Sequence, residues 1–187
     1  MLLEIEEKST IEDLLRVDGK AELIGGRIVL MMSVGHTPNR AAGRIYASLL
    51  LFADRTQAGQ PYTDGIGFSV PMLHSGRQSF SPDVSFYLGA PPKKKMRFVD
   101  GPPTFAVEVR SENDYGPTAE AAMALKRADY FEAGTLVVWD VDAESKIIYC
   151  YRSIAPNAKE VFNASQWATA EPAVPGWRIN LNEIFRD

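Results

Sequence analysis

The 187-residue chain has few side chains suited to disulfide or zinc chemistry, with only one cysteine and two histidines. The single cysteine, Cys150, excludes a disulfide framework and a zinc–cysteine cluster within one chain. The histidines, His36 and His74, lie far apart in the sequence and show no ligand spacing. Any bound metal would therefore be a hard cation held by carboxylates, such as Mg²⁺ or Mn²⁺.

Long hydrophobic runs and a surplus of positive charge are also missing. The purely apolar stretches, such as those within Ser48–Ala53 and Leu136–Trp139, fall far below the ~18–20 residues of a membrane span. The opening MLLEIEEKST is too acidic for a signal peptide, so we expect a cytoplasmic protein with no membrane partner. The net charge of −4 argues against a uniformly basic surface, although a local positive groove can still bind nucleic acid.

The composition is that of a globular protein, with 45% hydrophobic and 24% charged residues. The order of helical and strand patterns predicts one α/β (α+β) domain over residues 1–187, with a mixed central β-sheet flanked by helices and an N-terminal β-hairpin. Helices are expected from Ser9 to about Arg16, from Thr37 to before Gly59, and over Pro117–Ala133. Strands are expected at 21–23, 27–32, 62–70, 82–88, 104–109, 136–141 and 146–152, with weaker signals at 159–162 and 177–180.

Charged residues stand at the ends of two of the expected strands. Asp83 follows Pro82, and the apolar stretch FAVEV contains Glu108 and is followed by Arg110. Two carboxylates on adjacent strand ends can share one divalent cation, and a nearby cation can orient a water and offset charge on a phosphate. From the residues alone, two other interpretations stay open: Asp83 ends a turn, or Glu108 forms a structural ion pair with Arg110 or Lys126.

These residues resemble the Pro-Asp…Asp/Glu-x-Lys motif of the restriction-endonuclease-like, PD-(D/E)xK, nuclease superfamily. More closely, the chain is similar to the large bacterial Uma-type family of restriction endonucleases, formerly a domain of unknown function. The similar segments are AELIGGRIVLM, GHTPNRAAGRIYASLL, SPDVSF, AVEVRSEND…KRADYFEAGTLVVWDVD and VPGWRINLNEIF. The resemblance covers roughly Ala21 to Phe185, and the block Val107–Asp142 is its most specific part.

The chain departs from the general motif at Arg110, which stands where a lysine is usual. Arginine stays charged and cannot act as a base. The resemblance implies that a lysine on the following helix, Lys126, takes this place. Helical spacing of ~100° per residue puts Lys126 on one face with small and aromatic residues: Ala119, Ala122, Met123, Tyr130 and Ala133. The alternative is that Lys126 extends its ammonium group along the helix to solvent.

Further candidate residues are weaker. His36 matches a histidine of the family but can also cap the helix that it precedes, and Tyr130 is either an accessory hydroxyl or core packing. Glu22 is a possible further acid near the metal, although a solvated side chain on the hairpin is the expected alternative. The run Lys93, Lys94 and Lys95 can contact nucleic-acid phosphates or simply be solvated.

Two hypotheses result. In the first, the protein is a metal-dependent DNA endonuclease in which Asp83 and Glu108 bind Mg²⁺ or Mn²⁺. Lys126 then positions or helps to deprotonate the attacking water, and Arg110 steadies the scissile phosphate. The resemblance also favours a homodimer. In the second, the fold is a module that binds nucleic acid or a protein partner without cleavage.

Overall fold

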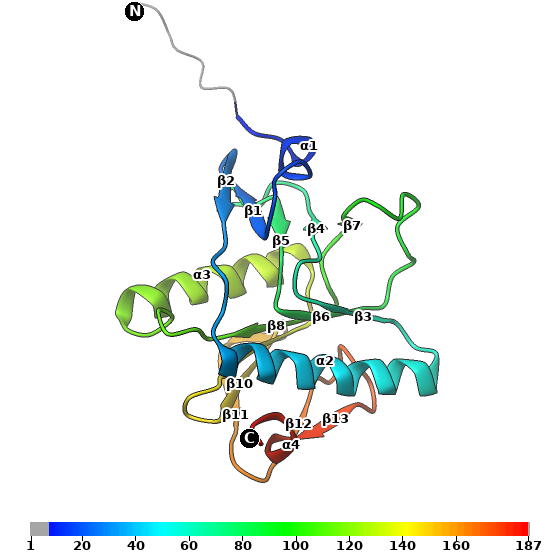
Figure 1. Ribbon diagram of the computed structural model, residues 1–187, viewed down its shortest axis with the longest axis vertical. Coiled ribbons are helices and arrows are strands. Elements are labelled where there is room, and N and C mark those ends of the chain that lie inside the picture. The colour runs from blue at the N-terminus through cyan, green and yellow to red at the C-terminus, as the bar shows by residue number, and fades with distance from the viewer. Residues whose placement is uncertain (1–7, 187) are drawn as a thin grey trace, which may run out of the picture.

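The centre of the fold is a six-stranded β-sheet with the strand order β11-β10-β9-β8-β6-β3 (Figure 1). The computed structural model describes residues 8–186. The six strands are β3 (Gln60–Thr63), β6 (Val84–Tyr87), β8 (Phe105–Val109), β9 (Val137–Asp142), β10 (Ile147–Arg152) and β11 (Ala155–Phe162). Strands β8 and β9 are parallel, and the other neighbouring pairs are antiparallel. The mixed sheet predicted from the sequence is therefore confirmed.

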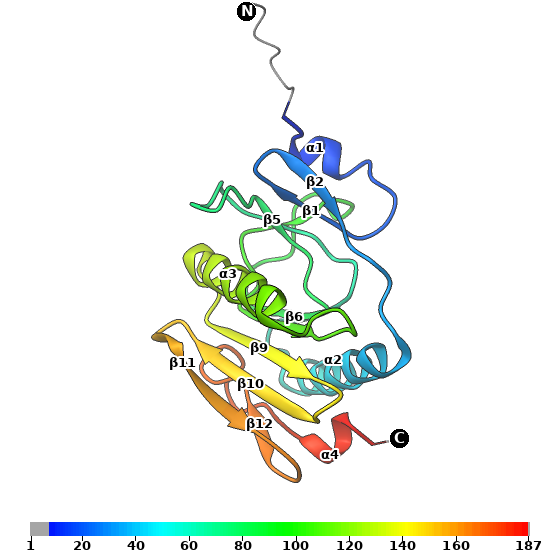
Figure 2. The same ribbon diagram turned by 90° about the vertical axis from the view of Figure 1, so that its left-hand side faces the viewer.

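Two long helices, α2 (His36–Thr56) and α3 (Pro117–Ala133), cover opposite faces of this sheet (Figure 2). Side chains alternate across a strand, so β8 contributes to both faces. Val107 packs in the cluster that contains Ile45 of α2, whereas Ala106 packs in the cluster that contains Tyr130 of α3. Among residues 8–186 no helix has the length and apolar character needed to span a membrane.

The predicted N-terminal hairpin is present, above α3 and β8 in the view of Figure 1. It consists of β1 (Ala21–Ile24) and β2 (Arg27–Leu30), paired antiparallel. Its two turn residues, Gly25 and Gly26, have φ angles of +59° and +76°. Both angles lie in the left-handed region that glycine adopts without strain, as a two-residue hairpin turn requires.

Several short elements complete the fold. They are α1 (Ile11–Leu14), β4 (Phe68–Ser69), β5 (Ser79–Phe80), β7 (Val99–Asp100), β12 (Trp167–Thr169), β13 (Arg178–Asn180) and α4 (Leu181–Ile184). Strands β5, β4 and β7 form a separate three-stranded sheet, and β12 pairs with β13. Residues of β13 and α4 join the same buried cluster as α2, so the C-terminal segment covers the α2 face of the central sheet.

The single strand predicted over 62–70 is wrong. Strand β3 ends at Thr63 in the central sheet, and β4 begins at Phe68 in the small sheet. The intervening turn contains Gly65 at φ +89°, where the chain leaves one sheet for the other. The apolar pattern continues through this change, which is why periodicity alone does not reveal it.

Three aromatic rings fill the core between the central sheet and α2. Phe105 of β8 lies edge-on to Trp139 of β9, with 5.0 Å between ring centroids. Trp177 completes the group, at 5.9 Å from Phe105 and 5.3 Å from Trp139. The parallel β8–β9 pair is thus fixed by packing as well as by its hydrogen bonds.

Phe105→Ala should lower the free energy of unfolding by about 3–5 kcal/mol, because the residue is fully buried and its removal leaves a cavity. Urea denaturation followed by circular dichroism would measure the loss. Leu125→Ala, at a position of α3 that is 66% exposed, is the matched control and should change stability by less than about 0.5 kcal/mol. Equal effects of the two substitutions would contradict this account of the core.

Candidate active site

Strand β8 delivers Glu108 to the α3 face of the sheet. Glu108 is two residues after Ala106, so its side chain lies on the same face of the strand and points toward α3. Val107 and Val109 point toward α2. It lies near the end of the strand, and 22% of its side chain is exposed. The acidic residue in this apolar strand therefore lies near the carboxyl end of β8, on the α3 face, and does not enter the core beside α2.

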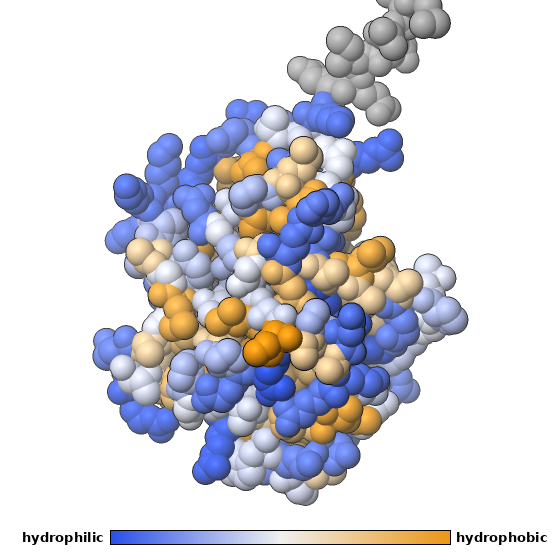
Figure 3. Space-filling model, turned by 180° about the vertical axis from the view of Figure 1, so that it is seen from behind, coloured by the Kyte–Doolittle hydropathy of each residue, from blue (hydrophilic) through white to orange (hydrophobic). Residues whose placement is uncertain are grey.

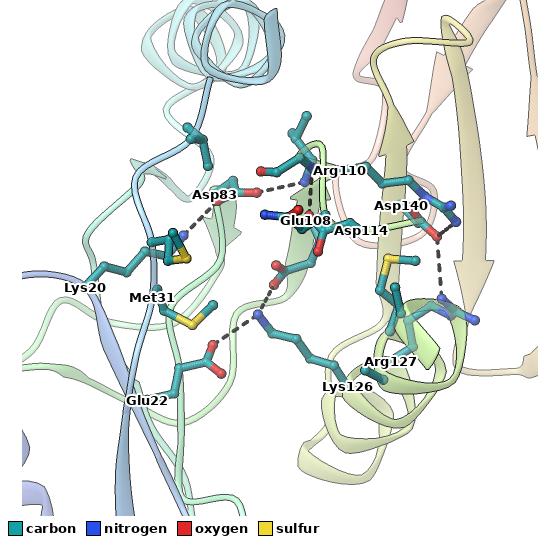
Figure 4. A pocket seen from close by; sticks show the side chains of 18 of the residues that line it. Lys20, Glu22, Met31, Asp83, Glu108, Arg110, Asp114, Lys126, Arg127 and Asp140 are labelled. Carbon is teal, nitrogen blue, oxygen red and sulfur yellow. Dashed lines mark hydrogen bonds and ion pairs between the residues drawn. The ribbon is translucent and has the colours of Figure 1, made fainter. Parts of the chain in front are cut away.

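Asp83 is brought beside Glu108 by the antiparallel pairing of β6 with β8. The amide of Asp83 donates to the carbonyl of Val107 at 3.1 Å. In return, the amide of Val109 donates to Asp83 Oδ2 at 2.8 Å. These two bonds hold the carboxylate at the strand ends, and Asp83 and Glu108 line the same cavity of about 460 Å³ (Figure 4).

Lys126 reaches this cavity from α3, the crossover between β8 and β9. Its Nζ lies 2.9 Å from Glu108 Oε1 and 3.1 Å from Glu22 Oε1. The side chain is 15% exposed and lies between the two carboxylates in Figure 4. The structure thus brings together Asp83, Glu108 and Lys126, the three residues that the sequence and the resemblance singled out.

Tyr130, one turn further along α3, is both a core residue and a partner of the site. Its ring stacks on Phe80 with 4.1 Å between centroids, and the residue is fully buried. Its hydroxyl donates to Glu108 Oε1 at 2.6 Å. Burial, together with the charge of Glu108, raises the pKa of the Tyr130 phenol well above its ordinary value, so the hydroxyl keeps its proton as a donor.

Glu22 is not the solvated hairpin residue that we expected: it is 2% exposed. Its carboxylate accepts a hydrogen bond from the amide of Ser81 at 3.0 Å and forms ion pairs with Arg77 and Lys126. Arg77 in turn binds Asp129 of α3 at 2.8 Å. The hairpin turns Glu22 toward the sheet, a contact between distant segments that the local pattern of the hairpin does not reveal.

Lys20 belongs to the site although the sequence did not point to it. Its Nζ lies 2.7 Å from Asp83 Oδ1 and 2.6 Å from Asp64. Burial works against its charged form, but Asp83 and Glu108 raise the pKa of Lys20 above its ordinary value. Lys20 precedes the hairpin in an unremarkable polar segment, so only the tertiary fold identifies it.

The cavity therefore concentrates opposite charges. Burial works against the ammonium form of Lys126, but Glu108 and Glu22 outweigh it and raise the pKa of Lys126 above its ordinary value. Burial also raises the pKa of Glu108; Lys126 opposes this change, and the neighbouring carboxylates Asp83 and Glu22 add to it. Lys20 also opposes the rise, so carboxylate and ammonium groups alternate around Glu108.

Arg110 lines the same cavity but is engaged by other partners. Its guanidinium donates to both carboxylate oxygens of Asp140, at 2.7 and 2.8 Å, in a two-pronged arrangement. It also donates to Glu120 of α3 at 2.5 Å. Asp140 is 2% exposed and receives a second cation, Arg127, at 3.5 Å. Contact of Arg110 with a phosphate stays a prediction.

The remaining candidates lie outside the cavity. His36 is the exposed first residue of α2, and Gly35, not His36, occupies the N-cap position. The expectation that His36 caps the helix is therefore wrong. Lys93, Lys94 and Lys95 are exposed in the segment between β6 and β7, so their contact with nucleic acid stays a prediction.

The donor atoms of the cavity suit a hard divalent cation. Within the described part of the chain, no group of three or more His, Cys, Asp or Glu side chains is arranged to hold a metal. Mg²⁺, however, commonly binds through one or two carboxylates and completes its shell with water and phosphate oxygens. The contacts of Glu108 with the Tyr130 hydroxyl and with Lys126 Nζ are both made through Oε1. Asp83 and Glu108 thus fit Mg²⁺ or Mn²⁺.

The chain is similar to known proteins in sequence and in fold. Residues 9–182 match the model of the Uma2 family, described as "Putative restriction endonuclease". A search of curated proteins gave no match. Among solved structures, the chain is similar to a "putative nuclease belonging to DUF820" from Anabaena variabilis ATCC 29413, with a TM-score of 0.71 and 16% identity. That likeness covers 94% of this chain and 97% of the other, and at this identity it shows the fold. Because the family model spans nearly the whole sequence, the chain belongs to the Uma2 family of restriction-endonuclease-like proteins.

Proposed function

We propose that the protein is a metal-dependent endonuclease that hydrolyses phosphodiester bonds of DNA. One observation carries the proposal: two carboxylates from neighbouring strand ends and a lysine from the crossover helix line a single cavity. Membership of the Uma2 family and the nuclease fold agree with it. The nature of the reaction, the metal and DNA as the substrate are our inferences from this arrangement.

Each residue of the site has a distinct proposed role. Asp83 and Glu108 would hold Mg²⁺ or Mn²⁺, which when bound polarises a phosphate oxygen and lowers the pKa of a coordinated water. Lys126, fixed between Glu108 and Glu22, supplies positive charge and N–H donors beside the attacking water and the phosphate. Tyr130 holds Glu108 in its rotamer through the 2.6 Å hydrogen bond.

Lys20 has a comparable place beside the second carboxylate. Its ammonium contacts Asp83 at 2.7 Å, so each proposed metal ligand has one lysine partner. A lysine beside a carboxylate offsets its charge, and its ammonium group could also donate to a phosphate oxygen of the substrate. Arg110 is held by two hydrogen bonds to Asp140 and by a further contact with Glu120, and neither residue is a proposed metal ligand, so we assign the direct cationic roles to Lys20 and Lys126.

The same lysine contacts favour a second candidate, a module that binds nucleic acid or a protein partner without cleavage. In such a protein the carboxylate–lysine pairs would be permanent structural ion pairs, and no metal would be needed. Homodimerisation, which would allow both DNA strands to be cut, is likewise a prediction. The experiments below separate the two candidates.

Asp83→Asn and Glu108→Gln should each reduce the rate of plasmid cleavage about 1000-fold or more. Loss of a ligand removes several kcal/mol of transition-state stabilisation, and about 1.4 kcal/mol corresponds to a factor of ten in rate. Gel electrophoresis of supercoiled plasmid incubated with Mg²⁺ or Mn²⁺ measures the effect. Glu132→Gln, which removes a carboxylate of α3 that binds His74, is the control and should cut at the wild-type rate. Undiminished cleavage by Asp83→Asn would refute the site assignment.

Lys126→Met should lower the cleavage rate about 100- to 1000-fold, the usual cost of removing one donor to developing negative charge. Lys159→Met, on the edge strand β11, is the matched control and should be fully active. Loss of Lys126 leaves Glu108 without its ion-pair partner and Glu22 with Arg77 alone, so folding must be checked by thermal denaturation. Lys126→Arg keeps a cation between the two carboxylates and should fold normally while cutting more slowly. Full activity in folded Lys126→Met would contradict its role.

Mg²⁺ or Mn²⁺ at 100 times its dissociation constant should stabilise the protein by about 2.7 kcal/mol. For a chain of this length that corresponds to a rise of about 5–10 °C in Tm. Differential scanning fluorimetry measures the shift, which should disappear in Asp83→Asn and persist in Glu132→Gln. A wild-type Tm that does not respond to metal would favour the non-enzymatic candidate.

A further inference from the structure

The cavity that contains the charged residues has two apolar walls. The first is the segment Leu30–Val34, which links β2 to α2 and which we call the strap. Its start is fixed to the chain before the hairpin, since the amide of Met31 donates to the carbonyl of Lys20 at 2.8 Å. Figure 4 shows Met31 on the side of Lys20 and Glu22, opposite the helix that carries Lys126.

The second wall is the N-terminal half of α3. Ala119, Ala122 and Met123 line the cavity there, on the helical face that also carries Lys126. Asp83 and Glu108 lie between the two walls, with Lys20 reaching them from the side of the strap and Lys126 from α3; we call these four residues the polar floor (Figure 4). The cavity is thus apolar on both sides and highly charged at its base.

The strap presents hydrophobic side chains to solvent. Leu30 is 65% exposed and Met32 is 82% exposed. On the face of the molecule seen in Figure 3, by comparison, hydrophobic residues lie in small groups among hydrophilic ones, as on ordinary protein surfaces. Exposed apolar residues beside a charged site indicate a ligand with an apolar part.

A phosphodiester group alone does not explain these walls, because its oxygens are charged or polar. The base attached to it does, since a nucleobase has flat faces that pack on apolar side chains. We propose that the substrate is single-stranded or locally unpaired nucleic acid, with a base held between the strap and α3 while its phosphate contacts the polar floor. This inference rests on the proposed nuclease function and specifies the substrate of the same site.

The size of the cavity favours one unpaired nucleotide. A volume of about 460 Å³ is that of a small-molecule pocket. Bases in a duplex are stacked on each other, so a base enters such a pocket only if it is unpaired or flipped out. Methionine adapts its shape and carries no strong hydrogen-bonding group, so Met31, Met32 and Met123 would accept any base. The site is therefore expected to select unpaired strands without reading their sequence.

Cleavage assays on matched substrates test the inference. The wild-type protein with Mg²⁺ or Mn²⁺ is given one labelled DNA sequence as a single strand, as a perfect duplex and as a duplex with a central unpaired bubble. The single strand and the bubble should be cut at least about tenfold faster than the duplex, because opening a base pair and its stacking requires a few kcal/mol. Equal or faster cleavage of the perfect duplex would overturn the inference and leave the proposed nuclease function intact.

Binding measurements test the apolar walls separately from catalysis. Fluorescence anisotropy with Glu108→Gln, to prevent cleavage, gives the affinity for labelled single strands. Adding Met32→Ser and Met123→Ser to this variant should weaken binding about tenfold, as expected when the apolar contacts of two side chains are lost. Met72→Ser, at an exposed methionine outside the cavity, is the matched control and should have no effect.

The outcomes distinguish the two proposals. Binding of single strands that depends on Met32 and Met123, with no cleavage of any substrate, would support the base contact and refute the nuclease. Affinity unchanged by Met32→Ser and Met123→Ser would refute the base contact, whether or not DNA is cut. An RNA strand of the same sequence should be tested in the same cleavage assay. Faster cleavage of single-stranded RNA than of single-stranded DNA would contradict DNA as the substrate.

Discussion

The arrangement of the site depends on a series of buried and half-buried ion pairs in which negative and positive side chains alternate. Asp129 binds Arg77, Arg77 binds Glu22, Glu22 binds Lys126, and Lys126 binds Glu108. A buried charge is tolerated only when it is paired, so each member constrains the next. Because these residues come from the hairpin, a loop, α3 and β8, the series fixes the hairpin over the sheet and encloses the cavity. The strap, which leaves the hairpin at Leu30, is positioned by the same contacts.

Local patterns in the sequence were sufficient for the residues that lie on regular elements. Alternation along FAVEV placed Glu108 on one face of a strand, and helical spacing placed Lys126 among Ala119, Ala122 and Met123, which do line the cavity with it. The two periodicities are set by backbone geometry and do not depend on distant partners. The central sheet, the hairpin and both long helices were predicted for the same reason.

Residues whose environment is created by distant segments could not be placed in this way. Glu22 looks solvated within its hairpin, and its burial results from Arg77 and Lys126, which are remote in the sequence. Lys20 is identified only by its contact with Asp83. The two-residue strands β4, β5 and β7 are likewise defined by pairing between separated segments, because so short a stretch has no periodicity of its own.

The arginine that departs from the usual motif has a physical explanation in the neighbouring strand. Two nitrogens of the Arg110 guanidinium donate hydrogen bonds to the two carboxylate oxygens of Asp140 in β9. The single ammonium group of a lysine does not reproduce this geometry. An arginine held in this way ties the end of β8 to β9 and to Glu120 of α3. The compact ammonium charge next to Glu108 is then supplied by Lys126 from the helix. Because the two positive charges are on different residues, Arg110 can hold the strand ends together. Lys126 can then face the space between the apolar walls, where a phosphate would lie.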